Sequence, residues 1–376
     1  MNREYDAVVV GARCAGSATA LLMARAGLRV LLLDRVHPGR DTLSTHALMR
    51  AGVLQLDRWG LLDRIVAAGT PAITGTTFHY ADGAERVALA APLYAPRRTV
   101  LDPILLDAAL EAGVEARLGV DVSAVTRADT GRVTGVRATA RGGAEQVVRA
   151  GLTIGADGLR SGIARSVGAR PTFEGASASA FVFGYWPVDR PTDYHWFYRP
   201  GRAAGVIPTN DGLACIWAAL PAAEFATRRR VGLERVLAEV LADVAPSAGL
   251  VATGERVGPL RGFPGVPARL RRPVGDGWAL VGDAGSFKDP LTAHGITDAL
   301  RDAELLTRAV VAGNPADYVD TRDALTLPLL RVAEEIAAYR WDTPRVKDLL
   351  RAESAAMKPE VAALRALDLV NVGRAA

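Results

Sequence analysis

The sequence has very little lysine and cysteine, and it has no long apolar run. Nearly all of its 45 basic residues are arginines, because only Lys288, Lys347 and Lys358 are lysines. Cys14 and Cys215 form no CxxC pair, which argues against a disulfide framework or a zinc site and makes a reducing cytoplasm the default. No apolar stretch reaches the roughly 18 to 20 residues of a membrane span. We therefore expect a cytoplasmic protein without a membrane span and without a metal site.

The basic residues give no sign of a nucleic-acid partner. The formal net charge is +4, but the arginines are spread along the chain. The two dense basic runs, at residues 228–230 and 269–272, lack interleaved aromatic residues and match no nucleic-acid-binding module. Solvated faces of surface elements explain both runs, and we expect a small-molecule substrate. The sequence is silent on oligomeric state.

The N-terminus is organised as a β-α-β unit. Tyr5–Val10 is a β-branched apolar run typical of a buried parallel strand, and residues 15–26 have a helical pattern that Gly27 closes. A second apolar strand over residues 28–33 leads to Asp34. A helix is expected over residues 47–67, broken around Gly52 and Gly60.

Two kinds of hydrophobicity pattern alternate along the rest of the 376 residues, which predicts two interlocked domains. Parallel-strand patterns return at residues 152–155 and 278–281, the second followed by a helix over residues 296–311. Residues 72–95 and 172–265 instead carry alternating patterns and aromatic short strands, with one helix near residues 224–243, which predicts a largely antiparallel layer. Residues 132–140 and 146–150 predict a hairpin, and residues 314–370 are expected to be helical.

The first strand-to-helix turn carries a dinucleotide fingerprint. Gly11 allows the tight turn and Gly16 the close approach of helix and strand, while the helix N-terminus offers free N–H groups to a pyrophosphate. Asp34 is placed to accept hydrogen bonds from ribose hydroxyls. Arg13 stands where the fingerprint usually has its second glycine, and its side chain can turn outward toward the phosphates.

Two later motifs put an aspartate at the end of a buried strand. Asp157 and Gly158 follow the strand at 152–155, and Gly282 and Asp283 follow the strand at 278–281. Ligands of doubly wound sheets bind at the carboxyl ends of the strands, where a carboxylate can accept from ribityl hydroxyls. The helix that begins near Ile296 can stabilise negative charge on a reduced flavin. The three motifs together therefore predict FAD.

With these motifs the sequence resembles the single-component FAD-dependent monooxygenases of the para-hydroxybenzoate hydroxylase type, which are related to flavin halogenases and geranylgeranyl reductases. The resemblance covers roughly residues 5–310. It implies an α/β fold: a glutathione-reductase-like Rossmann FAD domain, an inserted antiparallel-sheet substrate domain and C-terminal helices. The expected FAD domain comprises residues 1–71, 96–171 and 266–312, the substrate domain residues 72–95 and 172–265, and the C-terminal helical segment residues 313–376.

The resemblance also implies which residues contact the cofactor. Arg50 matches an arginine near the pyrophosphate and flavin, and Arg98 matches a second arginine that contacts FAD. The full set expected at FAD is Gly11, Ala12, Arg13, Ala15, Gly16, Asp34, Arg35, Arg50, Arg98, Val122, Asp157, Gly158, Gly282, Asp283, Pro290, Gly295 and Ile296.

The reaction type is less constrained than the cofactor. The hydroxylases commonly carry Pro-x-x-Gly-x-Gly, whereas this chain has Ala293 and His294 before Gly295. It lacks the Trp-x-Trp signature and catalytic lysine of halogenases, and also the Cys-Gly pair that geranylgeranyl reductases often show. The leading expectation is a monooxygenase that uses NADPH or NADH and O₂ to hydroxylate or epoxidise an aromatic or natural-product intermediate of secondary metabolism. A reductase of a carbon–carbon double bond and a non-catalytic FAD-binding pathway protein stay open.

Few side chains are candidates for a direct part in the chemistry, because the flavin itself carries out the redox step. His46 and His294 are the expected catalytic residues, since the resemblance places both of their loops beside the flavin ring. Tyr185, His195 and Trp217, in the aromatic strands, are the expected substrate-binding residues.

Overall fold

The computed structural model describes residues 4–37, 39–189, 192–244 and 254–371. The sheet that carries the fingerprint has the order β16-β17-β8-β1-β2-β5. All neighbours pair in parallel except β16 with β17. Its strands are β1 (Tyr5–Val10), β2 (Val30–Asp34), β5 (Glu115–Leu118), β8 (Glu145–Gly155), β16 (Val274–Gly275) and β17 (Trp278–Leu280).

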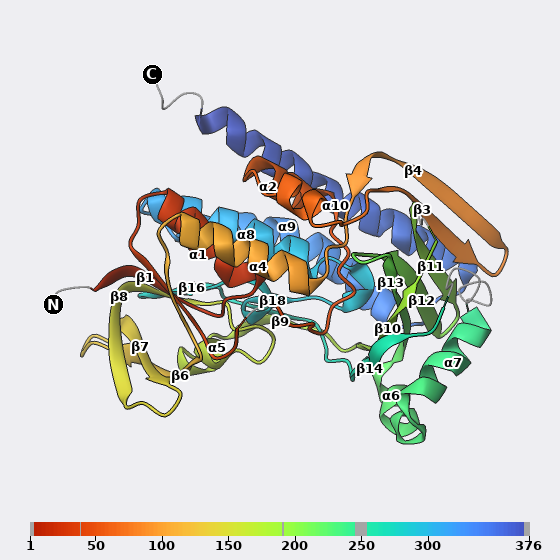
Figure 1. The fold of residues 1–376 in the computed structure, drawn as a ribbon, viewed down its shortest axis with the longest axis horizontal. Helices are drawn as coiled ribbons and strands as arrows, with labels where there is room; N and C mark the ends of the chain where they lie inside the picture. Colours follow the sequence, from red (N-terminus) through yellow and green to blue (C-terminus); the bar gives the residue numbers. More distant parts are fainter. Residues whose placement is uncertain (1–3, 38, 190–191, 245–253, 372–376) are drawn as a thin grey trace.

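This parallel sheet is covered on both faces, as its continuous apolar strands require. One face packs against α1 (Cys14–Arg25), α4 (Arg98–Glu111) and α8 (Gly295–Val311), with a core that includes Val9, Leu32 and Leu300. The other face packs against the ribbon of β6 (Val120–Arg127) and β7 (Val133–Ala140) and the short helix α5 (Gly162–Ser166). Figure 1 shows α1, α4 and α8 on one side of this sheet and β6, β7 and α5 on the other.

A second sheet of seven strands has the order β14-β10-β13-β12-β11-β3-β4. Its pairs are antiparallel except that β11 runs parallel to β3, so the segments 73–93 and 179–263 share one mixed sheet. The strands are β3 (Ile73–Tyr80), β4 (Gly83–Leu93), β10 (Ser179–Pro187), β11 (Asp193–Arg199), β12 (Arg202–Pro208), β13 (Leu213–Pro221) and β14 (Val257–Phe263). A small third sheet joins β9 (Pro171–Glu174), β15 (Arg269–Arg271) and β18 (Ser286–Phe287).

The two faces of the seven-stranded sheet have different partners. α7 (Leu233–Val244) packs on one face through Val236 and Val240, and α6 (Ala222–Arg228) lies beside it. The other face carries the aromatic residues and packs against the turn after α9 (Ala316–Ala337) and against α10 (Thr343–Asn371). Figure 1 shows α10, in dark blue, extending from this sheet across α2 toward the C-terminus.

The structure confirms the expected fold class and refines three elements. The helix expected over residues 47–67 is divided at Gly60 into α2 (Arg50–Arg58) and α3 (Leu62–Ala67), and Gly60 has a left-handed φ of 72°. Gly52 instead lies inside α2. A side chain has no room at this position, because a Cβ would come within 2.8 Å of the Thr297 hydroxyl on α8. A glycine inside a helix can therefore mark a close contact rather than a break.

The other two refinements concern chain continuity. β8 is one strand whose first half pairs with β7 and whose second half pairs with β1, where the sequence pattern had suggested two separate strands. The single helix expected near residues 224–243 is α6 and α7, separated at Gly232, where φ is 94°. Among the described helices, none has both the length and the apolar character needed to cross a bilayer.

Candidate active site

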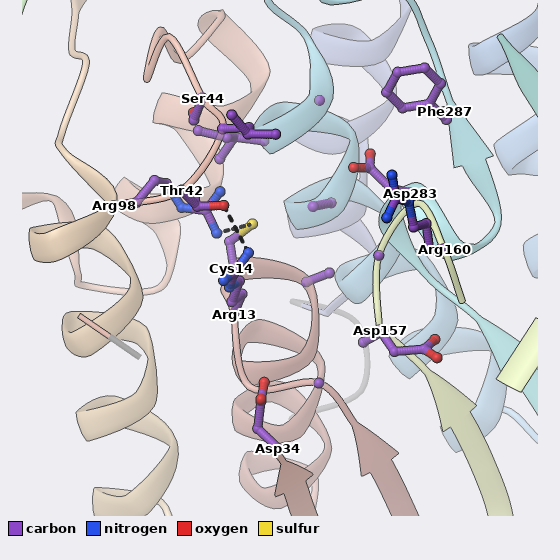
Figure 2. A pocket seen from close by; sticks show the side chains of 18 of the residues that line it. Arg13, Cys14, Asp34, Thr42, Ser44, Arg98, Asp157, Arg160, Asp283 and Phe287 are labelled. Carbon is purple, nitrogen blue, oxygen red and sulfur yellow. Dashed lines mark hydrogen bonds between the residues drawn. The ribbon is translucent and has the colours of Figure 1, made fainter. Parts of the chain in front are cut away.

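A cavity of about 890 Å³ opens where β1, β2 and β8 end and α1 and α8 begin. This volume is at the upper end of the range of about 300 to 1,000 Å³ typical of ligand sites. Figure 2 shows Arg13, Cys14 and Arg98 on one side of it, Asp157, Arg160 and Asp283 on the other, and Asp34 at one end. The cavity thus joins all three sequence motifs.

The fingerprint turn is as tight as its glycines suggest. Gly11 has φ of 109°, and a Cβ added there would lie 2.4 Å from the Ala156 carbonyl oxygen. A Cβ on Gly16 would lie 1.6 Å from the Gly11 carbonyl oxygen, so β1 and α1 approach as closely as backbones can. Arg13, the residue before α1, makes no side-chain cap, while the Cys14 N–H at the start of the helix faces the Asp102 carboxylate. The N-terminus of α1 lies at the cavity wall, where its positive end can face an anion.

Asp34 holds the turn from the end of β2. Its Oδ2 accepts from the Ala12 N–H at 2.6 Å, and its Oδ1 accepts from the Val36 N–H at 2.9 Å. Arg13 turns outward, and its guanidinium donates to the Thr42 hydroxyl at 2.8 Å. The side chain at the second-glycine position therefore leaves the turn itself open.

The two later aspartates have different surroundings. Asp157 already accepts from the Ser161 hydroxyl and from the N–H groups of Gly162 and Ile163, so it caps the start of α5. Asp283 is enclosed, and burial, followed by the negative charge of Asp298, raises the pKa of its carboxyl to about 6. Asp283 is therefore the aspartate with free capacity to bind a polar ligand.

The cavity wall beside α1 carries a buried ion pair. The Arg98 guanidinium donates two hydrogen bonds of 2.9 Å to Asp102 and contacts the Cys14 sulfur at 3.5 Å. Burial raises the pKa of the Cys14 thiol to about 11, so Cys14 is a neutral thiol. Arg50 is exposed at the start of α2 and does not line the cavity.

His46 links the cavity to the aromatic face of the seven-stranded sheet. Its Nε2 lies 2.6 Å from the Tyr185 hydroxyl, while its buried Nδ1 has no hydrogen-bond partner within the described residues. The backbone at His46 is left-handed, with φ of 71°. Burial, and then the nearby Arg98 and Arg97, lower the pKa of His46 to about 3, so the ring is neutral.

His294 lies on the other side of the same cavity, immediately before α8. Its Nε2 lies 2.7 Å from Oε2 of Glu360, which comes from α10, and its Nδ1 is also buried without a partner in the described part of the chain. The two expected catalytic histidines therefore face one cavity, each with one ring nitrogen anchored and the other unpaired.

The expected substrate-binding residues do not share one surface. Tyr185 and Trp217 point to the aromatic face, where the Trp217 ring packs 5.2 Å from Phe181. Side chains alternate along a strand, and His195 faces away from Trp196, on the side of Phe197. Its Nδ1 lies 3.1 Å from His79 Nε2. None of the three lines the cavity: Tyr185 and Trp217 lie behind it on the aromatic face, and His195 lies on the opposite face of the sheet.

Most of the residues expected at the cofactor line the cavity. Those that do are Gly11, Arg13, Ala15, Asp34, Arg35, Arg98, Val122, Asp157, Gly158, Asp283, Pro290, Gly295 and Ile296. Ala12, Gly16 and Gly282 lie just behind it: Ala12 bonds Asp34, and the Gly282 N–H donates to Asp302 at 3.1 Å. That these residues bind a cofactor stays a prediction.

The sequence reasoning missed the charged residues behind His294. Lys288 donates to Asp298, and Arg301 donates to Asp298, Asp302 and Glu360. The available signal was the set of charged residues inside the helix at 296–311, on turns that otherwise carry apolar residues. Nothing in the pattern indicated that Glu360, 66 residues after His294, joins them.

Three of these residues also have donor atoms close enough to surround a cation. The ligand atoms of His294, Asp298 and Glu360 lie within 4.8 Å of one another. However, Arg301 already pairs with both carboxylates and Lys288 pairs with Asp298, so a divalent ion would have to displace buried cations. We assign no metal to this cluster.

Sequence comparison places the chain among flavoproteins. A family model described as an FAD binding domain matches residues 4–313. Digeranylgeranylglycerophospholipid reductase 2 of Methanopyrus kandleri is 30% identical over 319 residues, covering 79% of this chain and 74% of that protein. The menaquinone reductase of Mycolicibacterium smegmatis is 27% identical over 353 residues, covering 85% and 79%.

Solved structures share the same fold. The flavin-dependent brominase Bmp2 superimposes with a TM-score of 0.80 at 21% identity, covering 98% of this chain and 99% of the brominase. The fit of FAD to this site has a local basis as well. The turn has no room for a Cβ at Gly11 or at Gly16, so β1 and α1 stay close, and the N-terminus of α1 lies at the cavity wall.

Proposed function

Because this chain belongs to the FAD binding domain family, we propose that it is an FAD-dependent reductase that saturates a carbon–carbon double bond in an apolar, polyprenyl-type molecule. The oxidoreductase class and the FAD cofactor follow from the family. The double bond, the apolar substrate and NADPH or NADH as the source of electrons are the proposal.

The relatives support reduction over oxygen transfer. Two proteins that match most of this chain at 30% and 27% identity carry names of reductases, and one name specifies a substrate with geranylgeranyl chains. The brominase, at 21% identity, supports the fold alone. In addition, Lys288, which lines the cavity, is ion-paired with Asp298 and is not free to serve as the catalytic lysine of a halogenase.

The observation that carries the proposal is the contact between His46 and Tyr185. It joins His46, which lines the cavity, to the aromatic face, which includes Phe183, Trp196 and Trp217 and is buried against the turn after α9 and against α10. This face forms an apolar layer behind the His46 end of the cavity, and an apolar surrounding suits an unsaturated hydrocarbon better than a charged ligand.

The charges near this contact are balanced, which also suits an uncharged substrate. The Arg97 guanidinium lies 4.4 Å from the centre of the Tyr185 ring and pairs with Asp41 at 2.5 Å. Arg97 also pairs with Asp211 at 3.5 Å. Arg261 lies 3.7 Å from Asp41, so two arginines face two carboxylates. These arginines therefore do not present an uncompensated clamp for a substrate carboxylate or phosphate.

Reduction of a double bond adds one hydride equivalent to one carbon and one proton to the other, and the π bond is lost. Reduced FAD, when bound, would supply the hydride equivalent and become oxidised. The chain must hold the proton and exclude water. We assign the proton to the pair of His46, which lines the cavity, and Tyr185, whose hydroxyl lies behind it at 2.6 Å from Nε2. Burial keeps both neutral, because it lowers the pKa of His46 and raises the pKa of Tyr185 above its usual range.

The test compares reduction with oxygenation in the purified FAD-bound protein. The flavin is reduced without oxygen and mixed with digeranylgeranylglycerophospholipid or with menaquinone in detergent. We expect flavin reoxidation and a product whose polyprenyl chain is two mass units heavier for each double bond reduced. A product that instead gains labelled oxygen from ¹⁸O₂ in air would establish the monooxygenase, and no turnover under either condition with any electron donor would indicate a non-catalytic FAD protein.

A further inference from the structure

His294 has one ring nitrogen fixed by the protein and one directed to no protein group. The ring is 1% exposed and lines the cavity, and Ala293 before it adopts a left-handed φ of 48°. Nε2 is held by Glu360, whereas Nδ1 has no partner among the described residues. A buried polar atom without a partner is costly, so Nδ1 is available to a ligand in the cavity.

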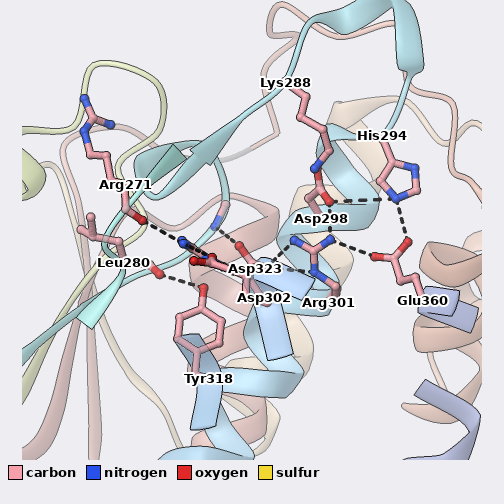
Figure 3. A network of polar contacts seen from close by, with 12 residues as sticks. Arg271, Leu280, Lys288, His294, Asp298, Arg301, Asp302, Tyr318, Asp323 and Glu360 are labelled. Atoms are coloured by element: carbon pink, nitrogen blue, oxygen red, sulfur yellow. Dashed lines mark hydrogen bonds and ion pairs between the residues drawn. The ribbon is translucent and has the colours of Figure 1, made fainter. Parts of the chain in front are cut away.

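The groups around His294 carry an excess of negative charge. Three buried carboxylates, Asp298, Asp302 and Glu360, face two buried cations, Lys288 and Arg301. Figure 3 shows Arg301 and the His294 ring each joined to both Asp298 and Glu360. One negative charge in this network therefore has no fixed cationic partner.

A proton on His294 balances the network. An uncompensated buried charge is expensive, and histidine is the side chain that gains a proton most readily near neutral pH. Against burial, the neighbouring Lys288 and Arg301 hold the pKa of Asp298 well below its usual range, so this carboxylate remains charged. It lies 3.9 Å from His294 Nε2, and Glu360, which Arg301 also contacts, lies 2.7 Å from the same nitrogen.

The other titratable groups that face this network do not offset it. Burial, and then the charge of Asp298, raise the pKa of the half-buried Asp283 to about 6, so where it ionises it adds negative charge. Arg98, which faces Asp283, is paired with Asp102, and burial raises the pKa of Tyr318, which faces Asp302, so that its hydroxyl is neutral. His46 is the contrast on the same cavity: it has Arg97 and Arg98 nearby and contacts no carboxylate in the described residues.

We propose that His294 is an imidazolium whose Nδ1–H donates a charged hydrogen bond to the isoalloxazine ring of bound FAD and stabilises its reduced, anionic form. Glu360 is the positioning residue that keeps the proton on the ring. Charged hydrogen bonds are about twice as strong as neutral ones, and the N-terminus of the 17-residue helix α8 adds positive potential at the same place. The inference rests on FAD binding and not on the identity of the substrate.

The first test is the midpoint potential of the flavin in the FAD-bound protein, measured without substrate against a reference dye. We expect His294→Gln and Glu360→Gln each to lower the preference for reduced over oxidised FAD at least tenfold, which is about 30 mV for a two-electron couple. Glu353→Gln is the matched control. It changes a buried carboxyl on the same helix that makes no contact with the network within the described residues, and it should leave the potential unchanged.

The second test reads the proton directly. The chain has five histidines, so selective ¹⁵N labelling resolves their ring nitrogens in the oxidised, FAD-bound protein. We expect one imidazolium pattern at pH 8 that disappears in both His294→Gln and Glu360→Gln. Absence of this pattern at pH 8 would overturn the proposal. So would a His294→Gln variant whose preference for reduced over oxidised FAD differs less than threefold from that of wild type.

The remaining outcomes are also decisive. If His294→Gln no longer holds FAD, Glu360→Gln decides, because it keeps the ring and nearly the same shape. A Glu360→Gln potential equal to that of wild type would overturn the role of Glu360 as the residue that retains the proton. Failure of the proposed reductase activity leaves both measurements intact, since neither uses a substrate.

Discussion

The ring nitrogen Nε2 of His46 and the hydroxyl of Tyr185 lie 2.6 Å apart, although 139 residues separate them in the chain. His46 belongs to the loop between β2 and α2, and Tyr185 belongs to β10 of the seven-stranded sheet. One hydrogen bond thus connects the wall of the cavity with the buried aromatic face behind it.

Removal of the Tyr185 hydroxyl should destabilise the fold and slow the reaction. Tyr185→Phe leaves the buried Nε2 of His46 without a partner, which we expect to cost about 1 to 3 kcal/mol in the free energy of unfolding. Tyr194→Phe is the matched control, because the Tyr194 hydroxyl is buried with no partner within the described residues. Urea denaturation should show a loss for Tyr185→Phe and no loss for Tyr194→Phe. Equal losses would mean that the bond to His46 contributes nothing.

A methyl group at Gly16 should abolish cofactor binding. Its Cβ would lie 1.6 Å from the Gly11 carbonyl oxygen, so β1 and α1 would have to separate. We expect Gly16→Ala to be purified without bound FAD and to lose at least about 1 to 3 kcal/mol of stability. Gly254→Ala is the control, because its nearest neighbour would be Pro187 Cγ at an ordinary 3.4 Å. Full flavin absorbance in Gly16→Ala would contradict the role assigned to the turn.

Glu353 should make the protein less stable as the pH rises. Burial raises the pKa of its carboxyl from 4.5 to about 8, so the folded protein holds a proton that the unfolded chain releases. The resulting stability is complete below about pH 4.5 and declines as the pH rises toward 8, by an amount on the order of a few kcal/mol. Glu353→Gln removes this contribution, so its advantage in unfolding midpoint over wild type should grow between pH 5 and pH 9. A constant difference across this range would show that Glu353 is ionised in the folded protein.

The Rossmann unit could be predicted from sequence because its determinants are local. The spacing of Gly11, Gly16 and Asp34 within one β-α-β unit fixes the turn, the helix start and the end of the second strand, and all three occupy the positions expected. The glutathione-reductase-like α/β fold was likewise predicted correctly, because strands buried on both faces and half-exposed strands have different apolar patterns. The expected domain boundaries stay a prediction.

The parts of the cavity that come from distant segments could not be predicted. The pairing of His294 with Glu360 depends on how α10 packs, and no pattern in either segment specifies that geometry. Asp157 matched the FAD motif, but its contacts with Ser161 and Gly162 show that it also caps a helix, which only the structure could reveal. For His195, strand alternation placed it on the face opposite Trp196, and the sequence could not tell which face would meet the cavity.

The leading expectation of oxygen transfer is the one that the relatives weaken. The resemblance to hydroxylases rested on motifs that bind FAD, and these motifs are shared with reductases. The residues that separate the two reactions lie around the substrate, where the pattern of apolar and polar residues reports sheet packing rather than chemistry. The cofactor was therefore easier to predict than the reaction.

The strand order of the parallel sheet has a consequence for biosynthesis. β1 is made among the first residues, yet its neighbour β8 ends at residue 155, and β17, which borders β8, ends at residue 280. At about 5 to 20 residues per second, a ribosome needs tens of seconds to join these strands, and contacts so distant in sequence also form slowly. The N-terminal β-α-β unit therefore waits for its neighbours β8 and β17 until about three quarters of the chain has been made.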